Sequence, residues 1–341
     1  MGRPVLAISL LLTLPAALAA ELPRYQATTL GTVVDVADSV FASGIDTNGT
    51  VVGHADTRFG ERAFIWSPAD GPHELPGPGN GPPRSRAHAI NEHSQVTGSI
   101  GTGIPGAPER AFIWDAEQGL RELGDLEAGE GSARGEDVND RGTVVGTASW
   151  QGGKRAFLWN DRDGMRDIGR EVTEDGDTQA LAINNRDHVA GYQIVDGRRR
   201  AFVLAPGRGV DRIGDRTGTG VARAVNDAGA VAGRLDDQAF MRLPIGDMRL
   251  LGYLDRTRPY SDAHGVNASG VVVGRSDTED GMRAFVWTAE HGMLRLDSLI
   301  ADNDSLTLYA ATAINDAGQI AAYGMDGDSG RSRAVRLDPL D

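Results

Sequence analysis

The stretch that decides the fold reads AHGVNASGVVVG at residues 263–274 and continues, after a short loop, as RAFVW at residues 283–287. The pattern, which reads roughly A-x-[AG]-[IV]-[ND]-x-x-G-x-V-V-G, occurs seven times at intervals of 41 to 48 residues. A repeat of this length is typical of the blades of a β-propeller. The turn residues of the seven copies are Asp46, Asn91, Asn139, Asn184, Asn226, Asn267 and Asn315.

Each copy predicts four short strands, the first of which ends at the turn residue. An Asn there favours a tight turn, and a Gly three residues later tolerates a positive φ. The copies at Asn91 and Asn184 have Ser94 and Asp187 in place of that Gly. We therefore expect turns that are slightly strained or longer at these two places.

The third strand carries the RAFIW-like motif and is apolar on both faces. With alternating side chains, Phe112 and Trp114 share one face, whereas Ala111 and Ile113 share the other. A strand of this kind must be covered on both sides. Stacked propeller blades provide that cover, because each sheet lies between two others.

The two ends of the chain predict how the ring closes. In other copies a Leu-Gly pair ends the fourth strand. Such a pair also occurs at Leu30-Gly31, before the first inner strand. The last copy, by contrast, stops after its third strand, at 336–338. We expect an all-β fold, a seven-bladed β-propeller with four-stranded blades, whose last blade is completed by residues 25–31. Closure removes the edge strands that invite aggregation.

Residues 1–20 have the composition of a secretory signal peptide. Arg3 supplies a positive charge, residues 5–14 are apolar, and cleavage is expected near Ala19 or Ala20. A retained membrane anchor is the alternative, although the apolar stretch is short for a bilayer span. Residues 21–341 are expected to form one propeller domain that is secreted or periplasmic.

Composition narrows the partners. The chain has 341 residues, a formal net charge of −14 and no Cys, so disulfides and thiolate chemistry are excluded. An acidic protein is poorly suited to nucleic acid or anionic membrane surfaces. No later segment is long and apolar enough to span a membrane, and we expect a monomer.

The repeat resembles that of the bacterial extracellular-repeat proteins called the HAF family, after a His-Ala-Phe motif. Here the triplet reads Arg-Ala-Phe in five copies and Gln-Ala-Phe at 238–240, so its first letter departs from the family pattern. The resemblance covers almost all of the chain after residue 20. It implies export and a repeat fold, and it supplies no catalytic residue.

Loop lengths predict where a ligand binds. Loops from the second to the third strand, and from the fourth strand to the next blade, are long and variable, and in a propeller they lie on one face. Variable loops on a rigid scaffold usually carry binding. At the channel mouth of this long-loop face we expect the residues five before the turn residue, Arg86, Arg134, Gln179 and Asp262, and those three before it, His88, Glu136, Arg223 and His264.

His88 and His264 occupy the same repeat position, so they suggest a metal or carbohydrate site across the channel. The alternative is that both are inner-strand residues hydrogen-bonded to neighbouring blades. A metal site needs three or four ligands, and only two His recur, so no metal site is predicted. Acidic segments 277–280 and 326–330 suggest Ca²⁺ but lack a full ligand set, so no cofactor is predicted.

The Arg that precedes Ala-Phe in most copies has two interpretations. It forms either a cationic ring for an anionic ligand or one structural salt bridge or backbone hydrogen bond per blade. A residue fixed by the repeat is usually structural, so we favour the second. The residues concerned are Arg62, Arg110, Arg155, Arg200, Arg283 and Arg333.

No Gly-x-Ser-x-Gly or His-Glu-x-x-His motif occurs, so no catalytic residue is predicted. The leading hypothesis is an exported non-enzymatic binding or scaffold protein whose long-loop face holds an extracellular protein or glycan. The alternative is an extracellular glycan- or lactone-cleaving enzyme, in which His88, Glu136, Asp262 and His264 converge at the channel mouth. A surface-layer or matrix component is a third hypothesis.

Overall fold

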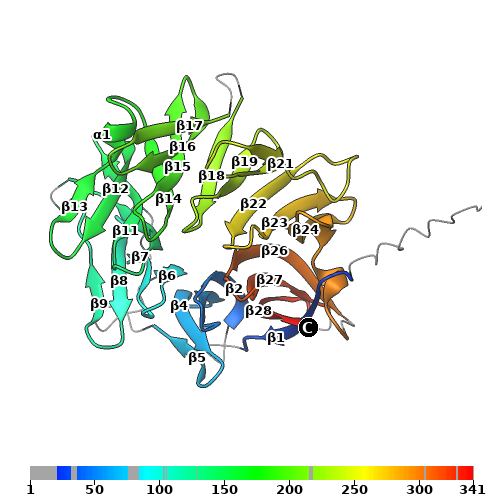
Figure 1. The fold of residues 1–341 in the computed structure, drawn as a ribbon. Helices are drawn as coiled ribbons and strands as arrows, with labels where there is room; N and C mark the ends of the chain where they lie inside the picture. Colours follow the sequence, from blue (N-terminus) through cyan, green and yellow to red (C-terminus); the bar gives the residue numbers. More distant parts are fainter. Residues whose placement is uncertain are drawn as a thin grey trace, which may run out of the picture.

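The computed structural model describes residues 21–340, except 32–36, 76–83, 103, 105, 128, 215–217, 303–304 and 328. Within these residues the strands form seven antiparallel sheets of four strands each. Figure 1 shows the sheets arranged around a central axis. The predicted all-β, seven-bladed propeller is confirmed. The predicted signal peptide, residues 1–20, lies outside the described residues.

Each blade is a meander that runs from the axis outward. The innermost strands of blades one to seven are β2 (Ala37–Ile45), β6 (Arg84–Ile90), β10 (Ala133–Val138), β14 (Thr178–Ile183), β18 (Gly220–Val225), β22 (Ser261–Val266) and β26 (Leu306–Ile314). The second strands are β3 (Val51–Thr57), β7 (Val96–Gly101), β11 (Val144–Trp150), β15 (Val189–Val195), β19 (Val231–Leu235), β23 (Val272–Thr278) and β27 (Ile320–Asp326).

The outer half of each blade follows the same order. The third strands are β4 (Gly60–Ser67), β8 (Arg110–Asp115), β12 (Gly153–Asn160), β16 (Arg198–Ala205), β20 (Gln238–Arg242), β24 (Gly281–Thr288) and β28 (Arg331–Leu340). The outermost strands are β5 (Gly71–Glu74), β9 (Gly119–Glu122), β13 (Gly164–Asp167), β17 (Gly209–Ile213), β21 (Met248–Leu250), β25 (Gly292–Arg295) and β1 (Arg24–Thr29). Two short helical turns, α1 (Gly169–Val172) and η1 (Asp297–Leu299), follow the outermost strands of blades three and six.

The ring closes as the chain ends predict. Strand β1 pairs antiparallel with β28 along its whole length, and Figure 1 shows β1 beside the C-terminus. The backbone N–H of Leu30 donates to the carbonyl of Ala334 at 3.0 Å, as that of Leu75 donates to Ala63 at 2.9 Å in blade one. Leu30 therefore ends the fourth strand of blade seven.

The turn residues link the blades into a ring. In blade two, Asn91 Oδ1 accepts the backbone N–H of Gln95 at 2.9 Å, which stabilises its own turn. The side-chain Nδ2 of Asn91 donates to the carbonyl of Asn139 in the next blade at 2.8 Å. Among the seven turns, all of them described, six such interblade bonds are made. The repeated Asn thus fixes both the turn and the distance to the next blade.

The two turns that lack Gly have the expected strain. Ser94 and Asp187 both have φ of 58°, in the left-handed region that non-glycine residues rarely adopt. Gly142 has φ of 72° at the equivalent position of blade three. The prediction of slightly strained turns is confirmed.

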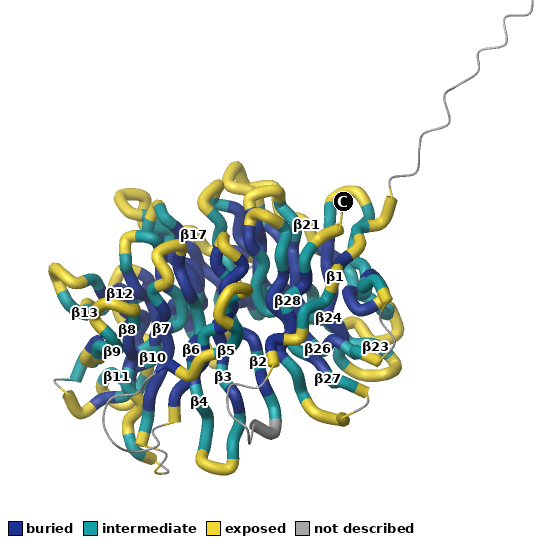
Figure 2. The backbone as a smooth tube through the Cα atoms, turned by 90° about the horizontal axis from the view of Figure 1, so that it is seen from below, coloured by how far each residue is buried: buried dark blue, intermediate teal, exposed yellow. Residues whose placement is uncertain are grey.

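The core lies between blades. Figure 2 shows the middle of the strands buried and the loops at both ends exposed. Phe112 packs with Val52 of blade one, whereas Ala111 and Ile113 pack with Val144 of blade three. The third strand is therefore covered on both faces by its neighbours, as its sequence predicts.

The Arg before Ala-Phe holds a loop of its own repeat. Arg110 donates from Nη1 to the carbonyl of Gly131 at 2.6 Å, and Arg155 donates from Nη2 to the carbonyl of Glu174 at 2.8 Å. Both acceptors lie in the connection to the next blade. These contacts support the structural interpretation of this Arg over a cationic ring.

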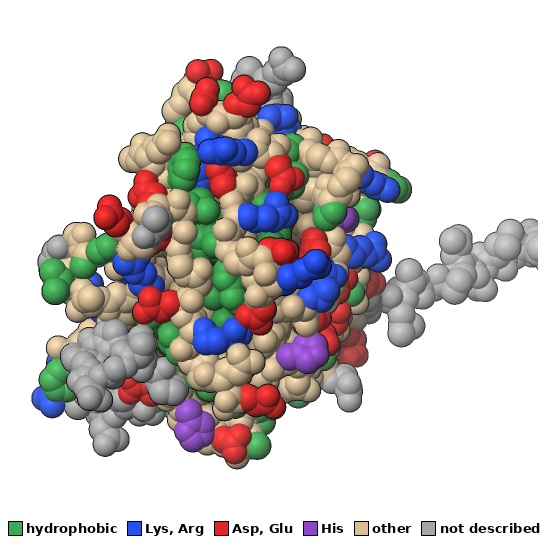
Figure 3. Space-filling model, turned by 90° about the vertical axis from the view of Figure 1, so that its left-hand side faces the viewer, with side chains coloured by type: hydrophobic (Ala, Val, Ile, Leu, Met, Phe, Trp, Pro, Cys, Tyr) green, Lys and Arg blue, Asp and Glu red, His purple; other side chains and the backbone are tan. Residues whose placement is uncertain are grey.

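The surface carries charges of both signs. Figure 3 shows acidic and basic side chains interspersed over one side of the molecule, with no continuous basic stripe on that side. No helix in the described part of the chain is long and apolar enough to cross a membrane.

Candidate functional site

Every innermost strand has a β-bulge at the same repeat position. The register with the second strand shifts three residues before the turn residue, so that one residue has no partner across the pair. Bulges of this kind re-aim a side chain and are common next to functional sites. The seven bulged residues are Ser43, His88, Glu136, Leu181, Arg223, His264 and Thr312.

The bulge explains the Gly that six of the seven second strands share. A Cβ on Gly98 would lie 1.9 Å from the carbonyl oxygen of Arg86, and one on Gly274 would lie 2.1 Å from that of Asp262. In these blades the inner strand approaches the second strand too closely for a side chain at this position, whereas blade seven has Ala322 there. The Gly of the V-V-G motif thus belongs to the bulge that shapes the channel.

The seven bulged residues surround one cavity of about 250 Å³ on the propeller axis. Of the predicted site residues, His88, Glu136, Arg223 and His264 line it. These seven residues are of six types, with His in blades two and six, although the surrounding repeat is nearly constant. The channel is therefore a largely polar site to which each blade contributes one side chain, with Leu181 the apolar exception.

His88 and Glu136 form an acid–histidine pair at the junction of blades two and three. His88 Nδ1 donates to the carbonyl of Gly135 at 2.7 Å and lies 3.7 Å from Glu136 Oε2. Burial lowers the pKa of His88 to about 3, so its ring is neutral at physiological pH. Burial also raises the pKa of Glu136 to about 7, so this carboxyl titrates near neutrality.

Asp262 and His264 form a second pair, in blade six. His264 Nδ1 donates to the carbonyl of Ala311 at 3.1 Å, and its Nε2 lies 3.8 Å from Asp262 Oδ2. Arg223 donates from Nε to Asp262 Oδ1 at 2.9 Å. Although burial alone would raise the pKa of Asp262, His264 and Arg223 hold it well below its usual range. Asp262 is therefore an ionised, fully buried carboxylate.

The remaining predicted residues make their ion pairs and strand contacts with other partners, although Arg134 is close enough to act electrostatically on both His88 and Glu136. Arg86 pairs with Glu61 of the preceding blade, and Arg134 Nη2 pairs with Glu109 Oε2 at 2.9 Å. Gln179 lies opposite Tyr192 in the register of β14 and β15. The two Arg therefore bridge neighbouring blades, and the four residues of the enzyme hypothesis form two pairs instead of one cluster.

A second ring of residues was missed because only inner strands were considered. These residues lie on the second strands, eight positions after the turn residue, opposite the residues five before it. Two of them, Arg234 and Arg275, approach Asp262 Oδ2 to 3.9 and 4.0 Å. Another, His54, stacks on Phe41 with ring centroids 5.1 Å apart. The sequence does contain a signal for these residues, because the position eight after the turn residue varies among charged, aromatic and small residues.

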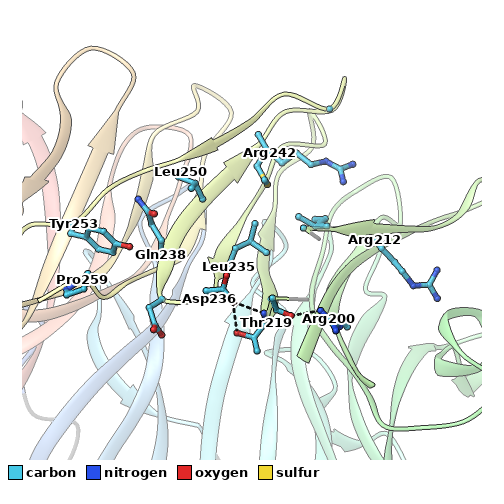
Figure 4. Close-up of a pocket in the computed structure, with 17 residues that line it drawn as sticks. Arg200, Arg212, Thr219, Leu235, Asp236, Gln238, Arg242, Leu250, Tyr253 and Pro259 are labelled. Atoms are coloured by element: carbon cyan, nitrogen blue, oxygen red, sulfur yellow. Dashed lines mark hydrogen bonds between the residues drawn. The ribbon is translucent and has the colours of Figure 1, made fainter. Parts of the chain in front are cut away.

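A wider cleft of about 770 Å³ lies between blades four and five, with part of its wall from the loop that leads to blade six. Figure 4 shows Leu235, Gln238 and Arg242 of blade five along it, with Arg212 of blade four on the other side. Blade five departs from the repeat here, because Gln238 replaces the usual Arg and Arg242 the usual Trp. Strand β21 is also only three residues long and fully exposed. Sequence reasoning did not predict this cleft, although both departures are visible in the sequence.

No group of three or more His, Asp or Glu side chains suited to a metal ion occurs among the described residues. Residue 328 of the acidic segment 326–330 lies outside them. The described side chains of the channel offer pairs and hydrogen-bond donors, which suit a polar organic ligand better than a cation.

No family model and no curated protein sequence matches the chain. Solved structures do resemble it. A streptogramin B lyase has a TM-score of 0.58 at 8% identity, over 93% of this chain and 98% of that one. A virginiamycin B lyase from Staphylococcus aureus has 0.58 at 10%, over 94% and 100%. An oligogalacturonate lyase from Vibrio parahaemolyticus has 0.57 at 12%, over 92% and 93%. At these identities the likeness shows the propeller fold alone.

Proposed function

We propose that the chain is an exported, non-enzymatic binding protein that holds a glycan in the channel on the propeller axis, where the lining residues lie one to three positions before the short turns of the inner strands and not at the predicted long-loop face. One observation carries the proposal. Seven bulged residues of six types line a single cavity within a scaffold that is otherwise repetitive. Specificity is expected where a repeat protein departs from its own repeat, on a rigid element that fixes each group.

The size and chemistry of the channel support a sugar. The cavity volume of about 250 Å³ is just below the roughly 300–1,000 Å³ of small-molecule pockets. This volume suits one sugar residue, with the rest of the glycan outside the cavity. Hydroxyl groups need donors and acceptors in alternation, and Ser43, Glu136, His264 and Thr312 supply them. Aromatic rings at Phe41 and Tyr323, 5.2 Å apart, provide an apolar face nearby.

The pairing of the charged groups supports binding over catalysis. Asp262, the most buried carboxylate of the site, is held ionised by Arg223 and His264. The ring of His88 is neutral, and its Nδ1–H is used by the carbonyl of Gly135. Glu61 and Glu109 are paired with arginines. Groups engaged with one another orient a ligand well but are poorly placed to attack a bond.

We also propose four further properties of the chain: membership of the HAF family, export through residues 1–20, a secreted or periplasmic location and a monomeric state. The repeat pattern supports the first, and the composition of the N-terminal segment supports export. Edman sequencing of the exported protein tests cleavage near Ala19 or Ala20. Light scattering after gel filtration tests the monomer.

A glycan array tests the central proposal. The mature chain, residues 21–341, is expected to bind a restricted set of glycans, and filling the channel by Thr312→Trp is expected to abolish binding. Glu117→Trp, in the exposed turn between the third and fourth strands of blade two, is the matched control and is expected to bind normally. Absence of all glycan binding, or full binding by Thr312→Trp, contradicts the proposal.

One observation favours the alternative, a glycan- or lactone-cleaving enzyme. The pKa of Glu136 is raised to about 7 in the channel, within reach of the titration range of a general acid or base. Incubation of the mature chain with polysaccharide and lactone substrates tests this function. Turnover that is lost in Glu136→Gln supports the enzyme, whereas turnover unchanged in that variant, or none, contradicts it.

A further inference from the structure

Three arginine side chains surround one carboxylate between blades five and six. Arg223 of β18, Arg234 of β19 and Arg275 of β23 lie 2.9, 3.9 and 4.0 Å from the carboxylate oxygens of Asp262. We call these three residues the arginine cluster. The carboxylate of Asp262 is fully buried and balances one of the three positive charges.

The rest of the charge is only partly compensated. Asp237 Oδ1 lies 3.5 Å from Arg234 Nη1, but its side chain is 72% exposed, so water screens this pair. No ion pair with another acidic side chain joins Arg275 in the described part of the chain. The cluster is therefore a local positive centre in a protein whose net charge is −14.

Three buried polar atoms of this group lack hydrogen-bond partners among the described residues. They are Nε of Arg234, Nε of Arg275 and Oδ2 of Asp262. Native proteins pair nearly all buried polar atoms, so each exception calls for an explanation. Three exceptions around one carboxylate indicate an arrangement shaped for a further charged group.

The outer ends of the guanidinium groups remain accessible. The side chains of Arg223 and Arg275 are 31% and 34% exposed. The Nη atoms of Arg223 and Arg275 donate no hydrogen bond to a described residue. The bond from Arg223 to Asp262 is made by Nε instead. Asp262 therefore holds the arginines in position from the buried side. An incoming anion would meet guanidinium N–H donors that are already oriented.

We infer that the arginine cluster binds the carboxylate of an acidic sugar, so that the glycan held in the channel is a uronic acid. This inference rests on the proposed function and names the ligand class. A carboxylate is planar and has two oxygens, which matches the fork of a guanidinium. His264, beside Asp262, lines the adjacent channel cavity and is placed to meet a hydroxyl of the same sugar ring.

Two forms of one ligand test the inference. The probes are an oligosaccharide ending in glucuronic acid and the same compound as its methyl ester, which keeps every hydroxyl but removes the charge. Calorimetry is expected to show at least about tenfold tighter binding of the acid, the effect of one charge-assisted hydrogen bond. The preference is expected to shrink as salt is raised, because exposed charges are screened.

Variants locate the preference. Arg275→Gln is expected to reduce the acid-to-ester ratio to near one while the ester binds as before, and Arg275→Lys is expected to keep part of the ratio. Arg249→Gln is the matched control. Arg249 is on the outermost strand of blade five, where it lies over the ring of Trp287, so its substitution is expected to leave the acid-to-ester ratio unchanged. If Arg275→Gln fails to fold, NMR of the intact protein replaces it. The Nε–Hε signals of Arg234 and Arg275 are then expected to shift with the acid and not with the ester.

The outcomes separate the two claims. Equal binding of acid and ester, or an acid preference that survives Arg275→Gln, overturns the arginine cluster as the carboxylate site and leaves glycan binding intact. Binding of neither compound, together with no hit on the glycan array, overturns the proposed function itself. Shifts of the arginine signals by inorganic sulfate alone, without the acidic sugar, overturn a saccharide site in favour of a simple anion site.

Discussion

The side-chain Nδ2 of Asn315 donates to the backbone carbonyl of Asp46 at 2.8 Å, across 269 positions of sequence. This bond joins blade seven to blade one and is the last of the six interblade links between turn residues. The seventh link, from Asp46 to Asn91, is missing because an aspartate has no amide N–H to donate. Asp46 Oδ2 is buried and has no hydrogen-bond partner among the described residues.

Asp46→Asn is therefore expected to complete the ring. One added hydrogen bond, and the removal of a buried acceptor without a partner, are expected to raise the free energy of unfolding by about 0.5–1.5 kcal/mol. Chemical denaturation measures the change. Asn226→Asp removes an existing link and is expected to lower stability by a similar amount. A neutral or destabilising Asp46→Asn contradicts the role given to this ring.

Gly98→Ala tests the bulge that shapes the channel. A Cβ there would meet the carbonyl oxygen of Arg86 at 1.9 Å, so we expect a loss of at least about 2–3 kcal/mol. Gly101→Ala is the control in the same strand, because its nearest neighbour would be Glu109 Cγ at 3.7 Å, and its cost is expected within about 1 kcal/mol. Equal costs for the two substitutions, measured by urea denaturation, would rule out the steric account.

Deletion of residues 21–30 tests the closure of the ring. It removes β1 and the buried side chains of Tyr25 and Leu30, and it exposes the outer edge of β28. We expect a lower melting temperature and concentration-dependent aggregation, because an open strand edge pairs with other chains. A synthetic peptide of residues 21–31 is expected to restore stability when added. A fully stable, monomeric deletion variant is incompatible with closure by β1.

Glu136 is expected to make stability depend on pH. Its pKa is about 7 in the folded protein and about 4.5 in the unfolded chain, so the folded state binds more protons between these values. Stability is therefore lost as pH rises from about 4.5 to 7. Glu136→Gln is expected to match the parent near pH 4 and to exceed it by about 1–3 kcal/mol at pH 8. Denaturation curves at both pH values check this, and the opposite sign refutes the burial of Glu136.

The sequence predicted the blades because their chemistry repeats. The Asn turns, the apolar third strand and the second Leu-Gly pair at Leu30 each carry a local physical requirement that can be recognised in every copy. The strained turn at Ser94 was also predictable, since its Gly is absent. The bulge was not predicted, because it is a shift between two strands and leaves only an indirect mark, the Gly that recurs in six of the seven second strands.

The candidate site was predicted in part for the same reason. Counting back from the turn residue found His88, Glu136, Arg223 and His264, which do line the channel. Counting positions along the inner strands could not show that Asp262 is buried and contacts arginines of other strands. Arg234 and Arg275 belong to second strands, and their approach to Asp262 depends on how blades five and six stack, which no single repeat encodes.

Hydrogen–deuterium exchange of the mature chain with its acidic glycan is the most direct test of a ligand at the channel mouth. The account predicts slower exchange in the innermost strands β6, β10, β18 and β22 and in β23, with the outermost strands β9, β13 and β25 unchanged. Protection confined to the outermost strands, with the innermost strands unaffected, would contradict it.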